Sequence, residues 1–187
     1  VALLGSDADR VSYRAAVDTA HRPVHSGPDS PVQYNAFDPD LQLWVAAAIF
    51  VGLEDCYQLL RGELSAEAAE DFYRSAFPLG TTLQVREEQW PPTRADFDRY
   101  WDQACASIQI DEPVRDYLQD LIALRMLPWV LRPGWAQLLR FLTTGFLAPV
   151  FRDALGLAWS ARRQWCFERL FLLVALGNRF LPKFIRQ

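Results

Sequence analysis

The 187-residue sequence predicts an all-α fold: a single domain of about seven or eight helices around a buried central helix at about residues 39–61. Three observations support this prediction. Residues that start and stop helices recur along the whole chain. No segment alternates apolar and polar residues over the length of a strand. The run at residues 41–51 is apolar on nearly every face, which is typical of a helix enclosed by other helices.

The first helix is predicted from Ser6 to about His21. Ser6 is followed three residues later by Asp9, a pattern typical of a capping box. In a capping box the side chain of each residue accepts a hydrogen bond from the backbone amide of the other. Pro23 stops this helix, because proline lacks the amide hydrogen that a helix interior needs. Residues 26–37 are rich in Gly, Pro, Ser, Asp and Asn and are predicted to form a loop.

The central helix has the clearest boundaries. Asp38 is a strong N-cap, Pro39 suits the first helical position, and Gly62 is predicted to end the helix. Glu54 and Asp55 follow the apolar run, and we interpret them as a solvated pair near the end of this helix.

The later helices are predicted from the same kinds of signal. Pro78 and Gly80 interrupt one of them, and Gly177 is predicted to end the last. Their predicted starts, in order, are Ser65, Thr93, Asp111, Pro133, Pro149 and Ser160.

Composition limits the class of protein. A net charge of −4 provides no basic surface for nucleic acid. Cys56, Cys105 and Cys166 lie far apart in apolar stretches and are predicted to be reduced core residues of a cytoplasmic protein. We expect no transmembrane segment, because the apolar run at residues 170–177 is too short for one. The chain begins with Val1, so we expect one domain over residues 1–187 that lacks an N-terminal segment of the full-length protein.

Histidine occurs only twice, and both copies lie close together. His21 and His25 are four residues apart, a spacing that chelates zinc on a continuous helix. Pro23 lies between them and argues against that geometry. The alternative is structural: one histidine interacts with the end of the first helix and the other bonds a loop backbone. Sequence motifs of hydrolases, metalloproteases and nucleotide-binding proteins are absent from the sequence.

The string YNAFDPDLQLWVAA at residues 34–47 resembles the core motif of a bacterial and fungal family. This family includes the latex-clearing proteins (rubber oxygenases) and the oxygenase of mycophenolic acid biosynthesis. Further matching segments are HRPVHSG at 21–27, WPPT at 90–93 and LAP at 147–149, followed by Arg152. The resemblance therefore extends over nearly the whole chain and implies an all-helical oxygenase domain that binds haem b.

The resemblance also shows one departure. Haem-binding relatives have an iron-ligating histidine directly after Trp-Val, where this chain has Ala46, and a methyl group cannot coordinate iron. If haem b is bound, its metal ligand is predicted to be His21 or His25, and the serious alternative is no cofactor. The predicted cofactor-binding residues are His21, His25, Arg22, Trp44, Ala46 and Arg152.

Two functional hypotheses follow for this protein, which we take to be bacterial. The first is an oxygenase-like oxidoreductase that acts on an apolar small molecule in a cavity lined by the central helix. The second is a non-catalytic helical module that has lost the cofactor. It binds an apolar small molecule or a protein, and that protein can be another copy of this chain in a homo-oligomer. A further alternative is peripheral attachment to a membrane through residues 165–184.

Overall fold

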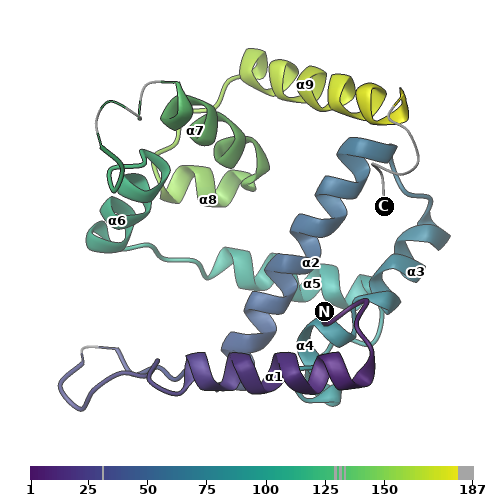
Figure 1. Cartoon of the computed structure of the whole chain (residues 1–187), viewed down its shortest axis with the longest axis vertical. Coiled ribbons are helices and arrows are strands. Elements are labelled where there is room, and N and C mark those ends of the chain that lie inside the picture. Colours follow the sequence, from purple (N-terminus) through teal and green to yellow (C-terminus); the bar gives the residue numbers. More distant parts are fainter. Residues whose placement is uncertain (31, 129, 131, 133, 181–187) are drawn as a thin grey trace. The chain divides into compact units, whose positions relative to one another are not determined.

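Figure 1 shows the computed structural model of the chain, which describes residues 1–30, 32–128, 130, 132 and 134–180. These residues form α-helices and one 3-10 helix, and they include no β-strand beyond an isolated bridge between His25 and Asn35. The all-α prediction is confirmed. The elements are α1 (Asp7–His21), α2 (Pro39–Arg61), α3 (Ala66–Ser75), α4 (Pro78–Thr81), η1 (Glu87–Gln89), α5 (Arg94–Ala106), α6 (Glu112–Ile122), α7 (Trp135–Phe146), α8 (Pro149–Ala154) and α9 (Ala161–Phe180).

The predicted helix starts rest on local hydrogen bonds. In α1 the Asp9 amide donates to the Ser6 hydroxyl at 3.2 Å, and the Ser6 amide donates to the Asp9 carboxylate at 2.9 Å. This is the predicted capping box. At the start of α2 the Asp40 amide donates to Asp38 Oδ1 at 2.8 Å. Gly62 follows α2 with φ of 93°, a left-handed conformation that glycine adopts without steric cost.

The chain forms two compact units. The first contains residues 1–54 and 64–104, and the second contains residues 55–63 and 105–187. Helix α2 therefore begins in the first unit and ends in the second. Each unit has its own packing, and the single domain stays a prediction.

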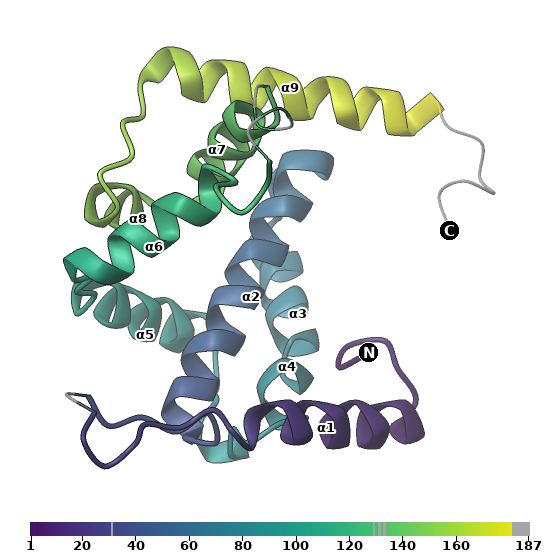
Figure 2. The same cartoon turned by 60° about the vertical axis from the view of Figure 1, so that its left-hand side comes forward.

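An aromatic core holds the first unit together, and α2 supplies one side of it. Figures 1 and 2 both show α1 crossing the N-terminal end of α2. The ring of Phe50 is fully buried and packs edge-on against Tyr73 at 5.3 Å and Phe97 at 4.8 Å, measured between ring centroids. The buried members of this core are Leu43, Ala46, Ala47, Phe50, Tyr73, Ala76, Val85, Trp90 and Phe97.

Helix α2 is buried on one face rather than all round. Because the run has no polar face, the sequence does not indicate which side of the helix is buried. In the structure the buried side is the one that packs on residues of α3 and α5. By length and composition, α2 is the one described helix that could cross a bilayer, a test that core helices also pass. Its exposed apolar residues are Leu41, Val45, Ile49, Leu53 and Tyr57.

The second unit is built around the contact of α7 with α9, and α6 also packs on α7 (Figure 2). Phe167 of α9 is 2% exposed, and its ring contacts those of Phe141, Phe146 and Phe171. Gly145 of α7 lies directly against this ring. The absence of a side chain at Gly145 therefore allows α7 and α9 to approach closely.

The predictions for Pro133, Gly177 and the three cysteines have different outcomes. The predicted helix start at Pro133 lies outside the described residues. The last helix does not stop at Gly177 but continues to Phe180. Cys56 and Cys105 are partly buried, whereas Cys166 is exposed, so the prediction that Cys166 is a core residue is wrong. Cys166 precedes the buried Phe167 on α9, and adjacent helical positions face different directions.

Candidate functional site

The N-terminal end of α2 and the loop before it bring together several of the predicted site residues. Two backbone hydrogen bonds close this loop: Ser26 donates to Tyr34 at 2.9 Å and Ala36 donates to Val24 at 2.9 Å. Gln42, on the first turns of α2, is 6% exposed and connects the loop to His21 at the end of α1. The sequence analysis did not single out Gln42, although it is the polar residue at the start of an apolar run.

The hydrogen bonds of Gln42 fix the tautomer of His21. Gln42 Nε2 donates to the Ala36 carbonyl at 2.6 Å and lies 3.3 Å from His21 Nδ1. Because an amide nitrogen only donates, Nδ1 of His21 accepts, and the ring proton is on Nε2. A metal-ligating histidine has the opposite arrangement, in which the second ring nitrogen donates and the first has a free lone pair. His21 is therefore oriented as a structural residue.

His25, unlike His21, donates a hydrogen bond from its Nδ1 to a carbonyl oxygen. Its Nδ1 lies 3.2 Å from the Ser26 carbonyl oxygen, which can only accept, so Nδ1 carries the proton. The Nε2 lone pair of His25 is then available for a metal. The side chain is exposed, and no group of three or more His, Cys, Asp or Glu residues among the described residues is suited to hold a metal ion. The predicted zinc chelate of His21 with His25 gains no support from these hydrogen bonds.

The other predicted cofactor residues are placed as follows. Arg22 is exposed at the C-terminal end of α1. Trp44 stacks on Trp101 of α5, with ring centroids 5.1 Å apart. Arg152 belongs to the second unit and donates from Nε to the Thr144 carbonyl at 2.8 Å and from Nη2 to the Gly145 carbonyl at 3.1 Å. Burial lowers the pKa of Arg152. These donors satisfy the free carbonyls at the end of α7, a structural role.

Ala46 is the decisive position for haem. It is 4% exposed and Ala47 is fully buried, and both pack in the aromatic core of the first unit. Iron at this place would need a nitrogen, sulfur or oxygen ligand, which alanine lacks, and the haem would need space that the rings of the core fill. The residues at this position do not fit haem.

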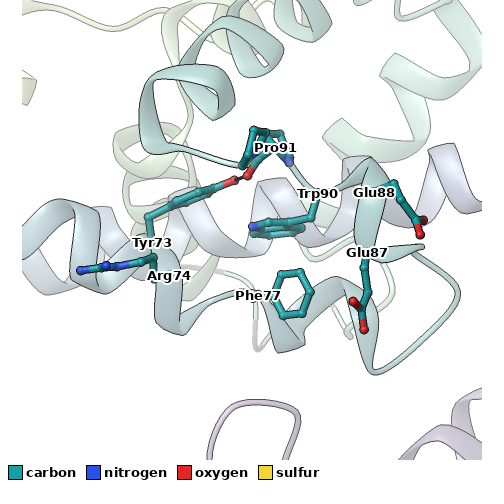
Figure 3. A pocket seen from close by; sticks show the side chains of 8 residues that line it. Tyr73, Arg74, Phe77, Glu87, Glu88, Trp90 and Pro91 are labelled. Atoms are coloured by element: carbon teal, nitrogen blue, oxygen red, sulfur yellow. Dashed lines mark hydrogen bonds between the residues drawn. The ribbon is translucent and has the colours of Figure 1, made fainter.

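A pocket of about 440 Å³ opens elsewhere in the first unit (Figure 3). No α2 residue lines this pocket, which we call the Tyr73 pocket, so it differs from the predicted cavity. Its two most buried rings, Tyr73 and Trp90, belong to the core cluster that α2 also joins. The lining residues are Tyr73, Arg74, Phe77, Glu87, Glu88, Trp90, Pro91 and Pro92.

Local chemistry shapes the Tyr73 pocket. Pro91 and Pro92 stop the chain from continuing the η1 helix and turn it toward α5. The Tyr73 hydroxyl donates to the Pro91 carbonyl at 2.5 Å, and the Tyr73 ring stacks on Trp90 at 5.8 Å (Figure 3). Burial raises the pKa of Tyr73, and the nearby carboxylate of Glu70 adds to this effect. Tyr73 therefore stays protonated and continues to donate this hydrogen bond at neutral pH.

Comparison with known proteins identifies the family. Residues 1–176 match the family described as ER-bound oxygenase mpaB/B'/rubber oxygenase, catalytic domain. The chain belongs to this family. The match confirms the resemblance that the string at residues 34–47 indicated, and it includes both units of the fold.

Two mycobacterial relatives are similar along most of their length. Both are described as uncharacterised proteins: Mb2261 of Mycobacterium bovis and Rv2237 of Mycobacterium tuberculosis. Each is 47% identical to the chain over 182 residues, which are 97% of this chain and 71% of the relative. No solved structure matches the chain significantly.

Proposed function

We propose that this protein is an oxygenase-type oxidoreductase that acts on an apolar small molecule. The observation that carries the proposal is the family match, which extends over residues 1–176 and describes an oxygenase catalytic domain. The Tyr73 pocket supports the substrate class, because its walls are mainly aromatic rings and prolines. Concave, largely apolar pockets of a few hundred cubic ångströms are typical small-molecule sites. The free thiols of Cys56 and Cys166 support a reducing, cytoplasmic location.

Haem b is the cofactor that the family resemblance implies, and its ligand in this chain is proposed to be His25. This proposal rests on the hydrogen bond of His25 Nδ1 to a carbonyl, because that bond leaves Nε2 free.

The test is an absorption spectrum with iron analysis of the protein expressed with haem precursor. A Soret band with roughly stoichiometric iron is expected in the wild type and in His21→Ala, and is expected to disappear in His25→Ala. A band that persists in His25→Ala, or that is lost only in His21→Ala, would contradict the assignment of the ligand. A colourless, iron-free wild-type protein would contradict haem-dependent oxygenase function.

A second function is favoured by one specific observation, the closed packing at Ala46. A helical module that binds an apolar molecule without catalysis needs no iron ligand, and small residues at positions 46 and 47 let the rings of the core pack closely on α2. This function predicts a colourless protein that retains the Tyr73 pocket.

Substitution Ala46→His tests whether a haem cavity persists beside α2. We expect no haem uptake beyond that of the wild type and a loss of about 2 kcal/mol in the free energy of unfolding, because a larger side chain overpacks a filled core. Ala48→His is the matched control, since Ala48 lies on the exposed face of the same helix and its substitution should change stability little. Haem uptake by Ala46→His alone would show that the cavity is intact, and would contradict the closed core.

A further inference from the structure

The Tyr73 pocket has negative charge that the protein itself does not neutralise. Glu87 and Glu88 are both exposed on η1, and neither side chain has an ion pair or hydrogen bond among the described residues. Arg74, the cation at the pocket, is paired with Asp71 on its own helix. Two carboxylates therefore remain at this pocket without a partner cation.

The wall next to these carboxylates is aromatic. Phe77 is half-buried, and Figure 3 draws its ring below that of Trp90, with the side chain of Glu87 to its right. Trp90 is 5% exposed, and its indole Nε1 is buried without a hydrogen-bond acceptor among the described residues. An indole N–H only donates, so this wall attracts a cation through its ring faces and not through a hydrogen bond.

Aromatic faces and free carboxylates attract the same kind of ligand. The face of an aromatic ring carries partial negative charge and attracts an ammonium group, and the attraction grows when water is excluded. A carboxylate that lines the same pocket attracts a cationic ligand and repels an anionic one. Apolar walls alone would accept any apolar molecule, so the charges provide the selectivity.

We propose that the Tyr73 pocket binds an apolar ligand through a cationic amine or quaternary ammonium group. Glu87 and Glu88 supply the countercharge, and Phe77 with Trp90 supplies the ring faces. This inference rests on the apolar small-molecule ligand of the proposed function and adds the charge of that ligand. It does not depend on haem or on turnover.

The test compares three probes that share a benzene ring and differ in charge. Isothermal titration calorimetry of the full chain measures phenethylammonium, phenethyl alcohol and phenylacetate. Phenethylammonium is expected to bind about tenfold more tightly than the alcohol, which corresponds to a free-energy difference of ~1.4 kcal/mol. Phenylacetate is expected to bind most weakly. The preference for the cation should shrink at high salt, because exposed carboxylates are screened.

Variants locate the effect in the pocket. Glu87→Gln with Glu88→Gln should remove the preference for the cation and leave binding of the alcohol unchanged. Asp102→Asn with Asp116→Asn is the matched control: it changes the net charge equally at exposed positions outside the pocket lining and should keep the preference. Phe77→Leu should weaken binding of phenethylammonium more than binding of phenethyl alcohol, because the aromatic face is lost while the apolar volume remains.

Three outcomes would overturn the proposal: no binding of any probe, equal binding of cation and alcohol, or a preference that survives the Glu87→Gln, Glu88→Gln substitutions. Equal binding of phenethylammonium and phenethyl alcohol would remain consistent with an apolar ligand and would contradict only the proposal that this ligand is a cation. Absence of all binding would also remove the pocket as the substrate site, while the spectrum and iron content still test the oxygenase proposal independently.

Discussion

Replacing Gly145 by alanine is expected to destabilise the second unit by about 3 kcal/mol, because the added methyl group overpacks a closed aromatic cluster. A Cβ at this position would overlap the ring of Phe167. That ring is 2% exposed and is held by the rings of Phe141, Phe146 and Phe171, so it cannot move aside without displacing its neighbours. Urea unfolding followed by circular dichroism measures the change.

Two further variants separate overpacking from helix propensity. Gly177→Ala lies on α9 with open space around the position, and should leave stability unchanged or raise it slightly, because alanine favours a helix over glycine. Phe167→Leu in the Gly145→Ala background should recover part of the loss, and a double-mutant cycle measures this coupling. An unfolding midpoint of Gly145→Ala equal to that of the wild type would contradict the close contact between α7 and α9.

Local signals were sufficient to predict where most helices begin. The capping box of Ser6 with Asp9 and the N-cap at Asp38 depend on residues within three or four positions of each other, so the sequence contains all the information. Gly62 ends α2 for the same reason, since its positive φ is a property of one residue. Gly177 carried the same signal and was misleading, because a glycine inside a helix costs only about 1 kcal/mol and the helix continues past it.

The covered face of α2 could not be predicted, because its apolar residues occupy every side of the helix. Which side is buried depends on residues from α3 and α5 that are distant in sequence. For the same reason, the Tyr73 pocket was not predicted. Its wall pairs Tyr73 with Trp90 across an intervening helix and loop, and only the folded chain brings them into stacking contact. The resemblance supplied the family and the haem position, but a family motif does not carry the packing that closes the space around Ala46.

The interpretation of Glu54 as a solvated residue is wrong, and the reason is a partner 40 residues away. Its side chain is 7% exposed and pairs with Arg94 at the start of α5. Arg94 is 25% exposed; it also donates to Asp98 at 2.8 Å and lies over the ring of Phe50 at 5.4 Å. Burial alone would lower the pKa of Arg94, but hydrogen bonds to Glu54 and Asp98 outweigh burial and raise it. Asp55, the next residue, is only partly buried.

Substitution Arg94→Met is therefore expected to destabilise the first unit by about 3 to 5 kcal/mol, because it leaves the Glu54 carboxylate buried without a partner. Methionine keeps most of the volume over Phe50, so lost packing contributes little. Asp98→Asn is the matched control: it removes the exposed partner of the same guanidinium and should change the free energy of unfolding by less than about 1 kcal/mol.

The double substitution Glu54→Met with Arg94→Met distinguishes the burial of an unpaired charge from the loss of a stabilising pair. If the carboxylate is the cause, replacing both partners by apolar side chains should recover most of the stability that Arg94→Met loses. Chemical denaturation of the four proteins of this cycle gives the coupling energy directly. A loss for Arg94→Met no larger than that for Asp98→Asn would show that Glu54 reaches water. A double variant as unstable as Arg94→Met would instead place the effect in the packing of Arg94 on Phe50.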